Sequence, residues 1–157
     1  MRKIMFLLII FLALPNILWA ADPIVGTWKT NLKKSTVSDG QRTIKEEISI
    51  YREIEGGLME LAASTVYEDG TAEYNKLVWP KEGGVVKFLS ATLPEGMLYV
   101  EVLVEPGHWF ASIIKDKKQI GLYHKVISKD IKTMNQLYTG LDDNGNPITI
   151  KKVLERQ

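Results

Sequence analysis

The stretch Ile24-Val25-Gly26-Thr27-Trp28-Lys29-Thr30 decides the fold of this 157-residue chain. It is the first β-prone run after an apolar N-terminal segment. Glycine has no Cβ and lets another segment approach closely, while tryptophan supplies a large apolar area. The stretch therefore predicts the opening strand of the fold.

The segment before this stretch has the layout of a secretion signal. Arg2 and Lys3 form a positive start, residues 4–14 are an unbroken apolar run, and Ala20 and Ala21 are small. The run is too short to span a bilayer comfortably. We interpret the segment as a cleaved signal peptide, with an uncleaved N-terminal anchor as the alternative.

Composition narrows the class of the mature protein. We expect residues 1–20 to be the signal peptide and residues 21–157 to be one domain, exported to the periplasm or out of the cell. The chain has no cysteine, so neither disulfides nor a lipid anchor on cysteine can form. Removing the signal changes the net charge from +1 to −1. That value predicts no nucleic-acid partner and no stable membrane insertion after cleavage.

The mature chain is a series of β-prone runs separated by turn-forming clusters of Gly, Asn, Asp and Pro. The gaps are short enough for hairpins and too short for parallel crossovers. We therefore predict an all-β fold, an antiparallel up-and-down β-barrel of about 8–10 strands. The expected strands are 24–31, 42–54, 58–68, 71–79, 85–91, 97–104, 108–115, 120–128, 132–140 and 147–155.

Both ends of the chain resemble a family of small exported bacterial lipocalin-like proteins, most of them uncharacterised. Residues 24–35 are similar to the "GTWKLNxxKS" opening of that family. Residues 126–134 and 152–156, with the glycines between them, are similar to its ending. Ile131 stands where the family has a turn glycine, so we expect that hairpin to use another geometry. The resemblance implies a ligand-binding barrel and is vague between about 55 and 120.

The resemblance also implies how the barrel is closed. Trp28 would cap its floor, and Gly26 would allow the backbone to approach closely. A basic side chain of the last strand, Lys151, Lys152 or Arg156, would lie on the Trp28 ring as a cation–π partner.

Three charged side chains are candidates for ligand contact. Arg42, Glu46 and Arg52 share the alternation of the isoleucines in strand 42–54. If that face points inward, these charges need partners or water, as in a ligand-binding cavity. The alternative is that they lie at strand ends near the barrel mouths.

Aromatic and histidine side chains complete the candidate set. Tyr67 and Tyr99 could orient a ligand through their hydroxyls, or fill the core. His108 and His124 lie on the two strands of a predicted hairpin, in which residue 108 pairs near 126 and residue 110 near 124. They could form a metal or acid/base pair, or be unrelated strand residues; we include His124 in the ligand-binding set.

The chain carries no catalytic motif that we recognise. We expect no catalytic residue, no metal and no cofactor. The leading interpretation is an exported, non-catalytic protein that binds a small hydrophobic or amphipathic ligand inside the barrel. The alternatives are an envelope protein-interaction module with a packed barrel, whose protein partner the sequence does not identify, and an enzyme for a hydrophobic substrate.

Overall fold

The computed structural model describes residues 22–36, 42–142 and 144–157. The expected signal peptide, residues 1–20, lies outside the described residues. Within those residues, no helix has both the length and the apolar character needed to cross a membrane.

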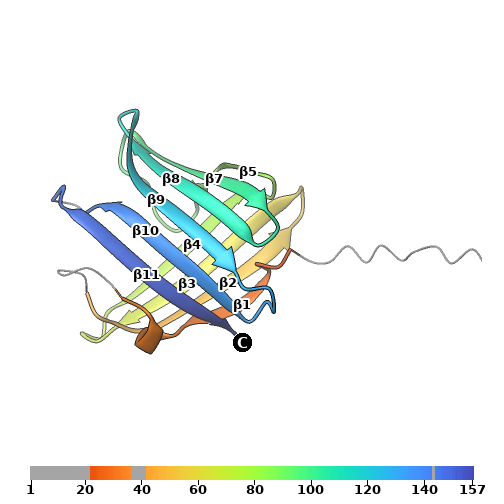
Figure 1. Ribbon diagram of the computed structural model, residues 1–157. Coiled ribbons are helices and arrows are strands. Elements are labelled where there is room, and N and C mark those ends of the chain that lie inside the picture. The colour runs from red at the N-terminus through yellow and green to blue at the C-terminus, as the bar shows by residue number, and fades with distance from the viewer. Residues whose placement is uncertain (1–21, 37–41, 143) are drawn as a thin grey trace, which may run out of the picture.

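One sheet of eleven antiparallel strands curves into a barrel (Figure 1), which confirms the predicted fold class. Around the sheet the order is β5-β7-β8-β9-β10-β11-β1-β2-β3-β4-β6, so most strands lie beside their neighbours in sequence. A single 3-10 turn, η1 (Leu32–Lys34), interrupts the described β-structure. The strands are β1 (Gly26–Thr30), β2 (Ile44–Ile54), β3 (Leu58–Tyr67), β4 (Ala72–Pro80), β5 (Gly83–Val85), β6 (Lys87–Phe88), β7 (Met97–Glu105), β8 (His108–Lys115), β9 (Lys118–Ile127), β10 (Thr133–Leu141) and β11 (Pro147–Arg156).

The expected single strand 85–91 is wrong. Residues 83–88 instead form two short strands on either side of the buried Val86. β5 pairs with β7, whereas β6 pairs with β4, so this segment passes from one edge of the sheet to the other. Gly83 and Gly84 have φ values of 97° and 144°, which only glycine adopts without strain and which allow the backbone to change direction.

The floor of the barrel is a buried cluster around Trp28. Trp28 is fully buried, and its indole N–H donates to the carbonyl oxygen of Ile24 at 2.7 Å. Trp79 and Trp109, which are also buried, belong to the same cluster. Because the indole N–H is satisfied internally, Trp28 can be buried completely without leaving an unpaired donor.

Arg156 covers this floor from the end of β11. Its guanidinium lies 4.7 Å from the centroid of the Trp28 ring. Nη1 donates to the carbonyl of Val25 at 3.0 Å, and Nη2 donates to that of Pro23 at 2.5 Å. A Cβ placed on Gly26 would lie 2.9 Å from Nη1, so the guanidinium can occupy this position only because residue 26 has no side chain. Trp28 is also paired with Arg156 in the β1–β11 ladder.

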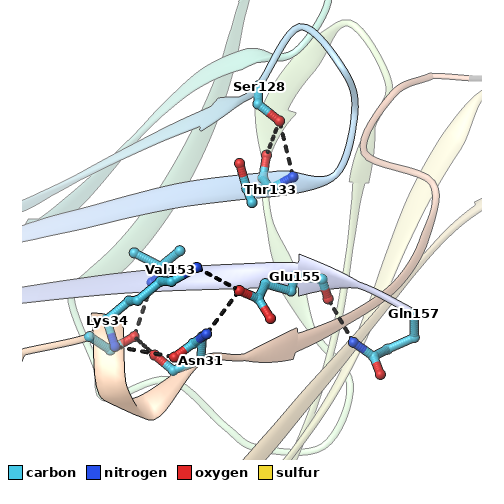
Figure 2. Close-up of polar contacts among 8 residues, drawn as sticks. Asn31, Lys34, Ser128, Thr133, Val153, Glu155 and Gln157 are labelled. Carbon is cyan, nitrogen blue, oxygen red and sulfur yellow. Dashed lines mark hydrogen bonds and ion pairs between the residues drawn. The ribbon is translucent and has the colours of Figure 1, made fainter.

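Polar contacts also hold η1 against β11, as Figure 2 shows. Asn31 donates to Glu155 Oε1 at 2.8 Å, and Lys34 Nζ binds the same oxygen at 3.0 Å. The Ser35 hydroxyl accepts from the backbone N–H of Val153 at 3.0 Å. The Asn-Leu-Lys-Lys-Ser sequence thus fastens the segment after the first strand to the last strand.

The β9–β10 hairpin keeps the geometry of a glycine turn although Ile131 occupies the position. Ile131 has φ 58°, in the left-handed region, so the expectation of another geometry is wrong. The turn is held by the Ile131 N–H donating to the Ser128 carbonyl at 2.9 Å, and by Arg156 Nε donating to the Ile131 carbonyl at 3.0 Å. These bonds maintain a conformation that is unfavourable for a β-branched residue.

We predict that Ile131→Gly stabilises the protein. The left-handed conformation costs an isoleucine about 1–2 kcal/mol, and the added freedom of glycine in the unfolded chain removes about half of the gain. The free energy of unfolding in urea should rise by about 0.5–1 kcal/mol. Ile131→Ala is the control, because it keeps a Cβ at positive φ. Equal stability of the two variants would contradict the explanation that the left-handed backbone at residue 131 is strained by a Cβ.

Candidate functional site: the barrel interior

The barrel interior holds a partly open cavity of about 310 Å³. Its walls come from strands all around the sheet and from the β6–β7 loop. This volume is at the small end of ligand pockets in proteins. The cavity lies above the Trp28 floor, with Tyr51 and Trp79 of the buried cluster in its lining.

The two sides of the cavity differ in polarity. One side is apolar and comes from β3, β4, the β5–β6 segment and the loop after it; it includes Leu61, Ala63, Leu77, Val86, Phe88 and Leu93. The other is polar and comes mainly from β2, β7, β9, β10 and β11; it includes Glu47, Ser49, Tyr99, Glu101, Tyr123, Lys125, Gln136 and Lys152. A molecule with one apolar and one polar side would match both.

A buried ion pair lies on the polar side. Lys125 Nζ is 2.5 Å from Glu101 Oε1, and the two side chains are 8% and 3% exposed. Burial alone would lower the pKa of Lys125, but the Glu101 carboxylate and Tyr51 raise it above its usual value. Lys125 therefore stays protonated inside the barrel.

A second ion pair lies nearer to solvent. Lys152 Nζ is 2.6 Å from Glu47 Oε1, with the lysine 22% exposed. Thr30 donates its hydroxyl to the other carboxylate oxygen, Oε2, at 2.6 Å. Glu47 thus has a partner on each oxygen.

Aromatic side chains connect the two sides. The rings of Phe88 and Tyr99 are 5.8 Å apart in an edge-to-face arrangement, and Tyr99 and Tyr123 are 6.0 Å apart. Burial raises the pKa of Tyr51, Tyr99 and Tyr123, so these hydroxyls are protonated donors at neutral pH. In the described part of the chain, the buried indole N–H of Trp79 has no hydrogen-bond partner.

Of the six expected ligand-binding residues, only Tyr99 lines this cavity. Arg42 and Tyr67 do lie together, but outside it, with the guanidinium 3.7 Å from the ring centroid and ion-paired to Glu73. Glu46 is 44% exposed and binds Lys29 at 2.6 Å. Arg52 is exposed. None of these three charged residues lines the cavity, so the interpretation in which they face inward toward a ligand is wrong, and Arg42, just before β2, fits the alternative of a strand-end position.

The reason is that β2 presents its other face to the interior. Glu47, Ser49 and Tyr51 line the cavity, and alternation places Ile48 and Ile50 with Glu46 and Arg52 on the outside. The alternation is interrupted at the start of the strand, where the register shifts between Ile44 and Glu46. Strand β7 behaves in the same way, because Tyr99 and Glu101 point inward whereas Val102 and Val104 are 49% and 54% exposed. Sequence reasoning therefore missed Glu47, Lys125 and the interior role of Lys152. Lys152 had been expected near Trp28.

The histidines lie on the outer surface. The predicted register is confirmed, since His108 pairs with Val126 and Phe110 pairs with His124. The two Nε2 atoms are 2.8 Å apart, and Phe110 stacks on the His124 ring at 4.4 Å. Burial, followed by the proximity of His108, lowers the pKa of His124. The described residues contain no cluster of three or more potential metal ligands.

The fold is similar to that of solved lipocalin-like barrels. A point mutant of the fluorescent protein UnaG has 16% sequence identity over 87% of this chain and 97% of that chain, with a TM-score of 0.58. Wild-type UnaG has 14% identity over 85% and 96% of the two chains, with a TM-score of 0.53. The siderocalin Ex-FABP has 10% identity over 86% and 71%, with a TM-score of 0.40. No protein-family model and no curated protein matches this chain. The UnaG likeness places the chain among proteins with a calycin-type barrel fold.

We predict that breaking the inner ion pair destabilises the barrel. Lys125→Met leaves the Glu101 carboxylate buried without a counter-ion, which should cost about 3–5 kcal/mol in urea unfolding. Combining it with Glu101→Leu should restore most of that loss. Lys29→Met is the control, because it breaks an exposed pair and should change stability little. A double variant no more stable than Lys125→Met would contradict this account.

Alkaline pH should unfold the protein together with tyrosine ionisation. Because the pKa values of Tyr51, Tyr99, Tyr123 and Lys125 are raised in the folded state, the unfolded chain loses these protons first. The free energy of unfolding should therefore fall as pH rises above about 10. Absorbance of the phenolate, recorded with circular dichroism, should show at least these three of the six tyrosines ionising only with the loss of β-structure. Tyr123→Phe should remove part of that late signal, and complete tyrosine ionisation in the folded barrel would contradict the assignment.

Proposed function

We propose that this protein is an exported, non-catalytic carrier that binds a small amphipathic molecule inside its barrel. The observation that carries the proposal is the cavity of about 310 Å³, bounded by an apolar and a polar side. A filled interior would have been incompatible with internal binding, and apolar cavities with a few directed polar groups are the usual form of ligand sites. Export is supported by the layout of residues 2–21.

The interior chemistry favours binding over catalysis. The tyrosine and lysine pKa values on the polar side move away from neutral pH, so these groups are not poised to exchange protons there. Each of the four charged side chains in the lining has an oppositely charged partner. Such groups can orient a molecule by hydrogen bonding and dipoles without reacting with it.

A surface function is the second candidate. Leu98, Val102 and Val104 form an exposed apolar row on the outside of β7, and Val85 of β5 lies beside it and is 50% exposed. Exposed apolar patches often mark interaction sites. This row supports the protein-interaction alternative independently of the cavity.

Blocking the cavity should separate the two functions. The neutral solvatochromic dye prodan should bind the mature protein with a blue-shifted emission. Ala63→Trp places a large ring in the cavity and should weaken binding by at least about tenfold. Ala62→Trp is the matched control, because this residue precedes Ala63 on the same strand and does not line the cavity. Equal loss in both variants, or no dye binding by the folded wild type, would contradict internal binding.

A further inference from the structure

We propose that the barrel selects ligands without net charge and discriminates against long-chain carboxylates and amines of the same length. This inference rests on the proposed internal binding and specifies the chemical class of the ligand. It follows from how the charges inside the cavity are arranged.

The lining has four charged side chains, and their charges cancel in pairs. Glu101 is paired with Lys125 at 2.5 Å, and Glu47 is paired with Lys152 at 2.6 Å. The three arginines of the described residues lie outside the cavity lining. Among the described residues, the lining therefore has no cation left over for an anionic ligand and no carboxylate left over for a cationic one.

A charged ligand would have to compete with a partner that is already in place. A carboxylate that reached Lys152 would displace or approach Glu47, which also accepts from Thr30. It would bring an extra negative charge into an interior that Lys125 and Lys152 only just neutralise. Burying an uncompensated charge is far more costly than burying a hydroxyl that finds a hydrogen bond.

A neutral polar group would find partners without breaking either pair. Ser49, Asn75, Tyr99 and Tyr123 all line the cavity. Among the described residues, none of these four side chains has a hydrogen bond to the protein, and none of their polar atoms is sealed from the cavity. A hydroxyl, amide or ester on the ligand could bind to them while its hydrocarbon part lies on the side formed by Leu61 and Leu77.

The test is competition against prodan at neutral pH by decanol, decanoate and decylamine, which share a chain and differ in charge. Wild type should prefer decanol to either ion by at least about tenfold. Glu47→Gln should free Lys152 and improve decanoate binding by about tenfold, with decanol affected little. Lys152→Gln should free Glu47 and improve decylamine binding instead. Because the two substitutions make opposite predictions, either one that folds tests the proposal.

Glu46→Gln is the control for Glu47→Gln, since the two glutamates are adjacent and each is ion-paired at 2.6 Å, one outside and one inside. It should leave all three affinities unchanged. Decanoate binding as tight as decanol to wild type, or an unchanged decanol-to-decanoate ratio in Glu47→Gln, would overturn the selectivity. Absence of prodan binding by folded wild type would instead overturn the proposed function itself.

Discussion

The contact between Arg156 and the floor of the barrel holds the two ends of the chain together. One guanidinium lies on Trp28 and donates to the carbonyl oxygens of Pro23, Val25 and Ile131. Only arginine has enough donors in one rigid plane to bind three carbonyl oxygens at once while it stacks on an aromatic ring. The strained turn at Ile131 and the glycine at Gly26 both follow from this contact, because each lets the backbone meet the guanidinium.

A sealed floor sets the electrostatics of the space above it. Glu101 and Lys125 are almost completely buried, so burying either charge without the other would be costly. Lys152 is partly exposed, and its pair with Glu47 meets both water and the cavity. Closing the barrel buries these charged groups, and burial requires that their charges be balanced in pairs. The proposed preference for neutral ligands follows from this balance.

The barrel was predictable from turn signals and strand spacing, and even the register of the hairpin around residues 116–117 was correct. The sequence did not allow us to predict which face of a strand lies inside the barrel. Alternation shows only that the two faces differ, and hydrophobicity chooses the inner one only where the interior is apolar. In β2 and β7 the interior is polar, and Ile48, Ile50, Val102 and Val104 face outward, so the rule gave the wrong side for Glu46 and Arg52. Arg42 lies before β2, and the register shift between Ile44 and Glu46 breaks the alternation that linked it to them. A charged residue can face the interior when an ion-pair partner faces it there, but such partners are distant in sequence: Glu47 and Lys152 are 105 residues apart.

The polar interior itself argues for a function rather than for stability. Buried ion pairs contribute little net stability compared with apolar residues of the same size, and they leave a costly charge if one partner is lost. The stabilising apolar contacts are concentrated in the floor cluster of Trp28, Trp79 and Trp109. A barrel under selection for stability alone would continue that packing upward and fill the cavity. Instead, paired charges and unpaired hydroxyls lie around an open space, and departures from good packing are expected where a protein binds something. This arrangement supports the proposal that the polar side is the surface that recognises a ligand.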